Sequence, residues 1–200
     1  SIYPKSKNKF LIGFSLGSMV AAQYGIDCNE KDIDGIICVS HSIKCFEGLK
    51  LLETPLHMKL YYEPMMKSLK RLMQKSTFYT DEEKKAVMKA RNFKGFDDIV
   101  TSKNMGLKNA EEYYKLIELI PKIPLIKVPT LFIFSENDPF SKAEWIPVND
   151  IRKSKYVAFI STKEGGHTAF PQGWNNKVSY SEEVSLDFCN CIGELKANCN

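Results

Sequence analysis

Four short apolar runs divide the chain, at residues 10–14, 33–40, 130–135 and 156–161. Each is rich in β-branched or aromatic side chains and is apolar at nearly every position, not only at alternate positions. Uninterrupted apolar runs of this length are typical of strands that are covered on both faces, as in a parallel sheet. Helical patterns lie between the runs, so the sequence predicts an α/β fold built on a mostly parallel sheet.

The stretch between the second and third runs is too long for a single crossover helix. It shows helical periodicity at residues 56–74, 81–91 and 109–120. Thr80, followed by three acidic residues, is a good N-cap for the second of these helices. We expect residues 42–125 to form a helical insertion that covers one end of the sheet as a lid. Core packing is the simplest explanation of its methionine and aromatic side chains, and a lipid-binding groove is the alternative.

Two further helices are expected outside this insertion. One follows the first apolar run at residues 17–24 and is expected to end at Gly25, since glycine commonly terminates helices. The other covers residues 182–195 near the C-terminus.

The charge pattern argues against a nucleic-acid-binding protein. The net charge is +4, and arginine, the residue that phosphate and base recognition usually clusters, occurs only as Arg71, Arg91 and Arg152. No apolar run approaches the roughly 18 residues of a membrane-spanning helix, and there is no signal-peptide pattern. We therefore expect a cytoplasmic protein. Membrane association of a full-length form, through an upstream segment, is kept as an alternative.

The six cysteines show neither CxxC nor Cys/His metal-binding spacing. Cys38 lies inside an apolar run and is expected to be a buried thiol. Cys189 and Cys191 are far from any histidine in the sequence, so no metal site is expected there. Reduced thiols are the natural expectation for a cytosolic protein.

A candidate nucleophile lies in the G-x-S-x-G motif at residues 13–17, with Ser15 at its centre. The motif is short, and an ordinary glycine-rich turn is the alternative. An apolar run precedes it and a helical pattern follows it, which is the context of a nucleophile elbow. We expect Gly13 and Gly17 both to be required because a Cβ there would meet neighbouring backbone. The following helix N-terminus favours negative charge on an oxyanion.

A nucleophilic serine needs a base, and the chain has three histidines. For a triad built on such an elbow, the order along the chain is serine, acid, histidine, with the histidine on a loop after the last strand. His167 follows the fourth apolar run, and two glycines before it allow a sharp turn. His41 and His57 precede any strand that could carry the acid, so His167 is the predicted base.

The acid is expected at the end of the strand before the histidine strand. Asp138 follows the run at residues 130–135 and is the predicted acid, with Glu136 as the alternative. An Asp-Pro turn is common by itself, but here it falls where a triad acid is required. The carboxylate would hold the imidazole in the correct tautomer and stabilise the imidazolium.

These motifs resemble those of the YheT-like α/β-hydrolases, a group that includes the abhydrolase-domain esterases and phospholipases of animals. The resemblance extends over about residues 2–172 and is carried by residues 2–4, 13–17, 96–101, 106–107, 111–114, 126–131, 137–139 and 165–167. The family usually has Asp-Asp-Pro where this chain has Asn137, Asp138 and Pro139, which leaves Asp138 matching the acid. Lys115 and Leu116 replace the usual Ala-Ser, a difference in the lid.

The resemblance implies the α/β-hydrolase fold and hydrolysis of carboxylic esters, with small or medium-chain acyl esters, lipids or phospholipids as substrates. It implies acyl transfer to Ser15, with His167 as base and Asp138 as acid, and no metal or organic cofactor. Two alternatives stay open: a catalytically inactive binding module with this fold, and a thioesterase or acyltransferase that uses the same triad.

One part of the expected site is missing from the sequence. The backbone N–H of Leu16 is the predicted first oxyanion donor, but the His-Gly dipeptide that often marks the second donor does not occur. We therefore expect residues 1–200 to be the C-terminal part of an α/β-hydrolase whose N-terminal half of the sheet is absent. The first strand would then be an apolar edge, which predicts a homodimer or pairing with the N-terminal half.

Overall fold

The computed structural model describes residues 8–173 and 178–198. The chain divides into two compact units. The first unit combines residues 1–44 with residues 119–200, and the second consists of residues 45–118. We describe each unit by itself.

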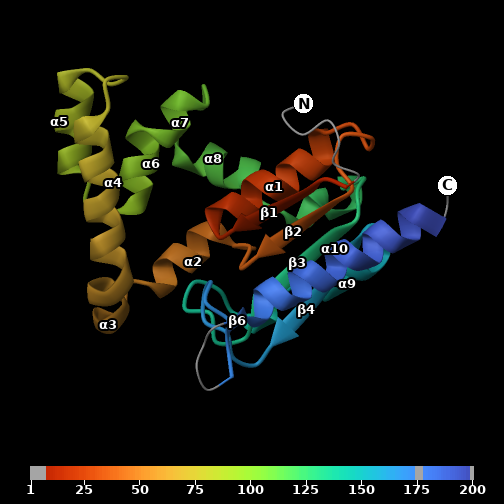
Figure 1. Ribbon diagram of the computed structural model, residues 1–200. Helices are drawn as coiled ribbons and strands as arrows, with labels where there is room; N and C mark the ends of the chain where they lie inside the picture. The colour runs from red at the N-terminus through yellow and green to blue at the C-terminus, as the bar shows by residue number, and fades with distance from the viewer. Residues whose placement is uncertain (1–7, 174–177, 199–200) are drawn as a thin grey trace. The chain divides into compact units, whose positions relative to one another are not determined.

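A four-stranded parallel sheet forms the centre of the first unit (Figure 1). Its order is β1 (Phe10–Phe14), β2 (Gly35–Val39), β3 (Thr130–Ser135) and β4 (Val157–Thr162). Neighbouring strands pair in parallel along the whole sheet. The predicted parallel α/β architecture is thus confirmed, with each strand within two residues of its expected position.

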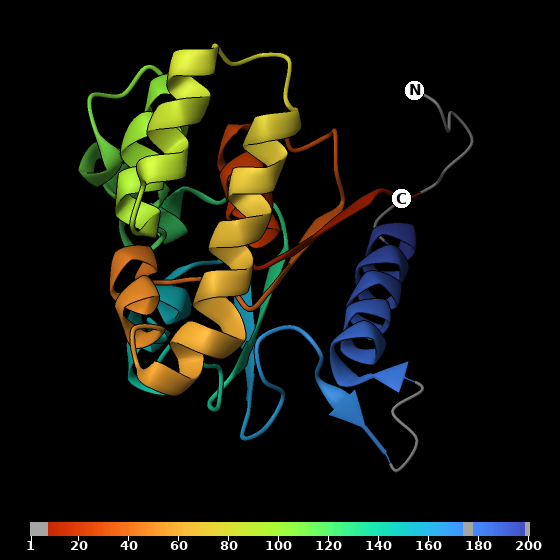
Figure 2. The same cartoon turned by 90° about the vertical axis from the view of Figure 1, so that its left-hand side faces the viewer.

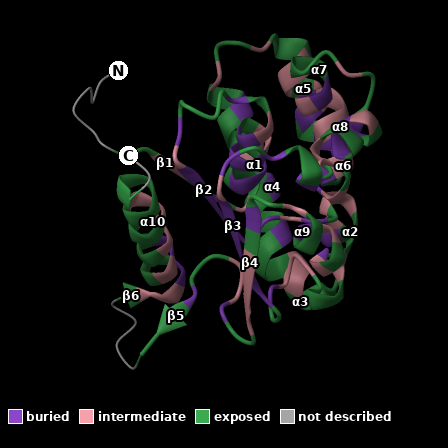
Figure 3. Cartoon of the chain, turned by 90° about the vertical axis from the view of Figure 1, so that its right-hand side faces the viewer, coloured by how far each residue is buried: buried purple, intermediate pink, exposed green. Residues whose placement is uncertain are grey.

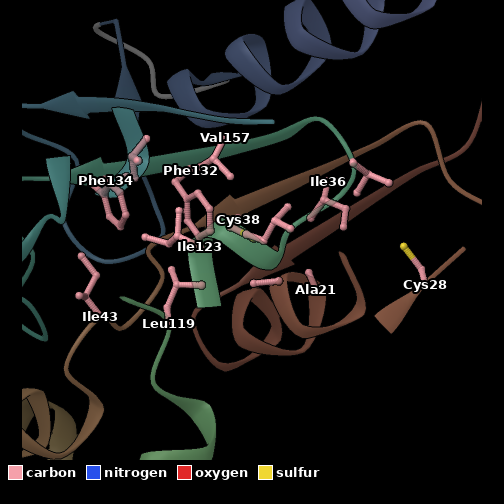
Figure 4. Packing of buried hydrophobic residues seen from close by; sticks show 14 of the residues in the cluster. Ala21, Cys28, Ile36, Cys38, Ile43, Leu119, Ile123, Phe132, Phe134 and Val157 are labelled. Atoms are coloured by element: carbon pink, nitrogen blue, oxygen red, sulfur yellow. The ribbon is translucent and has the colours of Figure 1, made fainter. Parts of the chain in front are cut away.

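Both faces of this sheet are covered, which explains why the strands are apolar at nearly every position. One face packs against α1 (Leu16–Asp27), the 3-10 helix η2 (Ile120–Leu125) and α9 (Val148–Lys153) through alternate residues such as Cys38 and Phe132 (Figure 4). The residues between them, such as Ile37 and Ile133, face α10 (Tyr180–Asn198). Figure 3 shows α10 on the opposite side of the sheet from α1.

Two helices of this unit differ from expectation. The expected stop at Gly25 is wrong, because α1 continues through it to Asp27. A Cβ on Gly25 would lie 2.8 Å from Cδ1 of Ile36, so this glycine allows α1 to approach β2 closely. The C-terminal helix α10 is longer than the expected 182–195. The sequence patterns also did not predict the short helices η2, η3 (Ala143–Trp145) and α9, or the antiparallel pair of β5 (Pro171–Gln172) and β6 (Val178–Ser179).

Strand β1 is an edge of the sheet as far as the structure describes it, and its apolar side chains are partly open. Ile12 is 45% exposed and Phe14 is 43% exposed, whereas β2 and β3 are buried throughout. These two side chains line a groove of about 760 Å³ whose other apolar walls include Val178, Leu186 and Cys189. An open apolar strand edge is a template for pairing with another strand.

We expect this edge to make the chain self-associate. Light scattering coupled to size-exclusion chromatography at tens of micromolar should show a dimer, and Ile12→Lys should shift it to monomer because a charge on the edge opposes pairing. Leu195→Lys, at an exposed position on α10, is the matched control and should leave the dimer intact. A wild-type chain that is monomeric at these concentrations would contradict the prediction.

The second unit is entirely helical within residues 45–118 (Figure 2). The expected helices at 56–74, 81–91 and 109–120 are present, but the first is composite: α3 (Pro55–His57), a π-helical turn η1 (Met58–Tyr62) and α4 (Glu63–Lys75). The other two are α5 (Asp81–Lys89) and α8 (Ala110–Ile117). Thr80 is the N-cap of α5, as predicted, and the structure adds a reciprocal capping box with Glu83. The unexpected helices are α2 (Cys45–Leu51), α6 (Phe93–Ile99) and α7 (Thr101–Asn104).

Two adjacent aspartates in α6, Asp97 and Asp98, connect three helices of this unit through hydrogen bonds. Asp97 accepts hydrogen bonds from Thr101 Oγ1 at 2.6 Å and from the Tyr114 hydroxyl at 2.7 Å. Asp98 accepts one from the backbone N–H of Ala110 at 2.7 Å. These contacts tie α6 to α7 and α8, so these two aspartates have a structural role. The lid function of the unit stays a prediction.

Candidate active site

Ser15 lies in the sharp turn between β1 and α1, the strand–helix context that the sequence predicted for it. Its φ of 51° is in the left-handed region, which is strained for a residue with a side chain. A Cβ on Gly13 would lie 2.3 Å from the carbonyl oxygen of Gly17, so Gly13 is required. The expectation for Gly17 was wrong, because a Cβ there would meet nothing within 4 Å. In this motif, close approach of the backbone therefore requires glycine at position 13 but not at position 17.

His167 reaches Ser15 from the loop after β4. Its Nε2 lies 2.8 Å from the Ser15 Oγ, although 152 positions separate the two residues. Gly166, with φ of 64°, provides the sharp turn before the histidine. The ring of Phe140 stacks on the imidazole with 4.2 Å between centroids, which limits the orientations that the imidazole can adopt.

Asp138 faces the other side of the same imidazole. The Nδ1 of His167 lies 3.0 and 2.9 Å from the two carboxylate oxygens of Asp138. Asp138 is 8% exposed, whereas the alternative acid, Glu136, is exposed. Because a carboxylate only accepts, His167 donates from Nδ1, which leaves Nε2 to accept the hydroxyl proton of Ser15. The three residues selected from the sequence are therefore in hydrogen-bond contact.

Asn137 connects the acid loop to the base loop, a role that sequence reasoning missed. Its Oδ1 accepts hydrogen bonds from Ser135 Oγ at 2.6 Å, from the Gly165 N–H at 3.1 Å and from the Gly166 N–H at 2.8 Å. The substitution of asparagine for the usual aspartate at this position was the available signal. An amide oxygen can accept these bonds without placing a second negative charge beside Asp138.

Leu16, the predicted oxyanion donor, is the first residue of α1. The first N–H groups of a helix have no partner within the helix, so this N–H is available to a ligand. Its role as a donor stays a prediction. The sequence offered no candidate for the second donor.

The other two histidines lie outside this arrangement. His57 belongs to the helical unit, where its Nδ1 lies 3.2 Å from the carbonyl oxygen of Leu51. His41 is 2% exposed, and its Nδ1 lies 3.1 Å from the Ser18 Oγ. Desolvation by burial lowers the pKa of His41 to about 4.

This lowered pKa predicts a pH dependence of stability. Between about pH 6.5 and pH 4 the unfolded chain binds a proton at His41 that the folded chain does not, so the free energy of unfolding falls as the pH falls through this window. The full loss is about 3 kcal/mol. Urea unfolding of the wild type and of His41→Asn, which does not titrate, should diverge only below pH 6.5. Parallel pH curves for the two proteins would contradict the prediction.

The described residues contain no group of three or more His, Cys, Asp or Glu side chains placed to hold a metal ion. Cys28, Cys38, Cys189 and Cys191 are free thiols, and Cys38 is fully buried as predicted. Cys199 lies outside the described residues. No helix in the described part of the chain is both long and apolar enough to cross a membrane.

Several known proteins that are similar in sequence to this chain are named as esterases, lipases or phospholipases. The chain is 29% identical over 192 residues to an abhydrolase domain-containing protein of Dictyostelium discoideum, covering 92% of this chain and 48% of that protein. It is 26% identical to the monoacylglycerol lipase of Saccharomyces cerevisiae (88% and 41%) and 27% identical to human phospholipase ABHD3 (97% and 48%). The putative esterase YheT of Escherichia coli is 32% identical over 91 residues, covering 42% of this chain and 26% of that protein. The chain spans about half the length of the first three relatives.

The fold is shared with solved α/β-hydrolases. The Pyrococcus furiosus esterase Pf2001 superposes with a TM-score of 0.52 and 17% identity, covering 93% of this chain and 55% of the esterase. The family described as Serine aminopeptidase, S33 (Hydrolase_4) matches residues 2–167. This match covers most of the chain and includes the four strands of the parallel sheet, Ser15 and His167, so the chain belongs to that family of α/β-hydrolases.

Proposed function

We propose that this protein hydrolyses carboxylic esters with small or medium acyl chains, including lipid esters, through an acyl-enzyme on Ser15. The observation that carries the proposal is the continuous contact from the Asp138 carboxylate through His167 to the Ser15 Oγ. A serine hydroxyl is a weak nucleophile at neutral pH unless a base accepts its proton. Here the base is in hydrogen-bond contact with the hydroxyl, and an acid orients it.

The geometry supports a two-step reaction. The Ser15 Oγ attacks the ester carbonyl carbon while its proton passes to Nε2 of His167, and Asp138 stabilises the resulting imidazolium. His167 then gives the proton to the leaving alcohol as the C–O bond breaks, which leaves the acyl-enzyme. Water deacylates Ser15 by the same proton transfers in reverse order. The Leu16 N–H would bind the oxyanion in both steps, together with a second donor.

The choice of esters rests on the names of the relatives, which include a monoacylglycerol lipase and phospholipases. The triad itself is compatible with thioesters as well, since they form the same acyl-enzyme. A panel of p-nitrophenyl esters from acetate to decanoate, measured beside acyl-CoAs, separates these classes. Preference for the acyl-CoAs would favour the thioesterase alternative over the proposed one.

Reaction with a fluorophosphonate probe tests the proposal directly. The activated Oγ displaces fluoride from phosphorus, so peptide mass spectrometry should find the adduct on Ser15. The same labelling should be performed on a form of the protein extended upstream, because the relatives are about twice as long as this chain. Labelling of the extended form alone would mean that upstream residues complete the site. Absence of labelling in both forms would overturn the proposal and favour a binding module.

A further inference from the structure

A buried hydrogen-bond chain leads from His41 to the main chain of the proposed nucleophile. The Nδ1 of His41 lies 3.1 Å from the Ser18 Oγ, and this Oγ lies 2.5 Å from the carbonyl oxygen of Ser15. His41 follows β2 and is 2% exposed, and Ser18, in the first turn of α1, is fully buried. These hydrogen bonds do not involve the triad side chains. They therefore act on Ser15 through its backbone carbonyl.

The direction of each hydrogen bond follows from counting protons. The Ser15 carbonyl only accepts, so the single hydroxyl proton of Ser18 is donated to it. The remaining partner of the Ser18 oxygen, His41 Nδ1, must therefore be the donor. His41 is then the neutral Nδ1–H tautomer, which agrees with the lowering of its pKa by burial. Its ring packs edge-on against Phe132, with 5.4 Å between centroids, which fixes the ring plane.

The Ser15 carbonyl and the Leu16 N–H belong to one peptide group. A trans peptide is planar, so these two groups point in opposite directions and rotate together. The carbonyl is held by two donors of Ser18, its backbone N–H at 3.0 Å and its hydroxyl at 2.5 Å. Holding the carbonyl therefore holds the Leu16 N–H. This support matters because the adjacent Ser15 has a strained φ of 51°.

We propose that His41 is a positioning residue that, through Ser18, fixes the orientation of the Ser15–Leu16 peptide and so of the predicted oxyanion donor. His41 orients the Ser18 hydroxyl, and that hydroxyl prevents rotation of the peptide. A neutral, buried histidine performs this role without adding charge near the nucleophile. The proposed orientation of the peptide does not depend on the proposed ester hydrolysis. The expected effect of His41 on turnover does rest on that proposed function.

Substitutions along the chain of contacts test the catalytic effect. His41→Leu and Ser18→Ala should each lower kcat by about 10- to 100-fold with KM unchanged, less than the ~10²–10³-fold cost of losing an oxyanion donor outright. His41→Asn, whose side-chain N–H can replace Nδ1–H, should restore most of the activity. The double variant His41→Leu/Ser18→Ala should be no slower than Ser18→Ala, because His41 acts through Ser18.

A readout independent of activity separates this proposal from the proposed function. In ¹⁵N–¹H NMR spectra, the Leu16 amide should shift and exchange faster with solvent in His41→Leu and Ser18→Ala, but not in His41→Asn. The imidazole ¹⁵N shifts of the wild type should report the proton on Nδ1 of His41. An unchanged Leu16 amide in His41→Leu, or a proton on Nε2 of His41, would overturn the proposal. If the wild type were not labelled by the fluorophosphonate but the NMR results were as expected, only the proposed function would be contradicted.

Discussion

Replacing Ser15 with alanine is expected to lower ester turnover by about 10⁶-fold, the effect of removing the nucleophile in serine hydrolases in which the triad acts as a unit. The reason is that, among residues 8–173 and 178–198, the Ser15 Oγ is the hydroxyl in contact with the proposed base, 2.8 Å from Nε2 of His167. The measurement is the kcat for the best p-nitrophenyl ester of the wild type and of Ser15→Ala, in whichever form of the protein the probe labels.

The matched control is Ser68→Ala, which alters an exposed serine on α4 of the helical unit. It should change kcat by less than twofold. Ser15 is only partly buried and the substitution removes a single oxygen atom, so the two variants should melt within a few degrees of each other. Residual turnover of Ser15→Ala above a hundredth of the wild-type rate would show that another residue carries the nucleophile.

Replacing Asp138 with asparagine is expected to lower kcat by about 10⁴-fold, because the amide no longer fixes the Nδ1–H tautomer of the histidine. In the wild type both carboxylate oxygens lie within hydrogen-bond distance of His167 Nδ1. An asparagine can still accept the Phe140 N–H that Asp138 Oδ1 accepts at 2.8 Å, so the loop should stay folded. The measurement is kcat together with circular dichroism to verify the fold.

Glu136→Gln is the control for the choice of acid. Glu136 lies two positions before Asp138 and is exposed, so its substitution should change kcat by no more than about twofold, the usual range for surface changes. If Glu136→Gln lost activity and Asp138→Asn retained it, the assignment of the acid would be wrong. Loss of activity in both would indicate that the loop as a whole, not one carboxylate, orients the histidine.

The order of the strands along the chain, and the parallel sheet that they form, could be read from the sequence. The information is local: an apolar run of five to eight residues without alternation requires cover on both faces wherever it occurs. The positions of Ser15, Asp138 and His167 followed from the G-x-S-x-G motif and from the order of serine, acid and histidine along the chain. In a parallel sheet the C-terminal ends of the strands meet at one edge. Residues placed directly after β1, β3 and β4 therefore come together at that edge.

The support of the site could not be read in this way, because it depends on contacts between segments far apart in the sequence. Gly25 matched a helix stop, but close packing of α1 on β2 decided its place inside the helix. His41 was rejected as the base because it comes before the acid in the sequence. In the structure, hydrogen bonds through Ser18 connect it to the Ser15 carbonyl. The sequence determined by local pattern which residues could react, and the tertiary structure decided by long-range packing and hydrogen bonding which residues hold them in place.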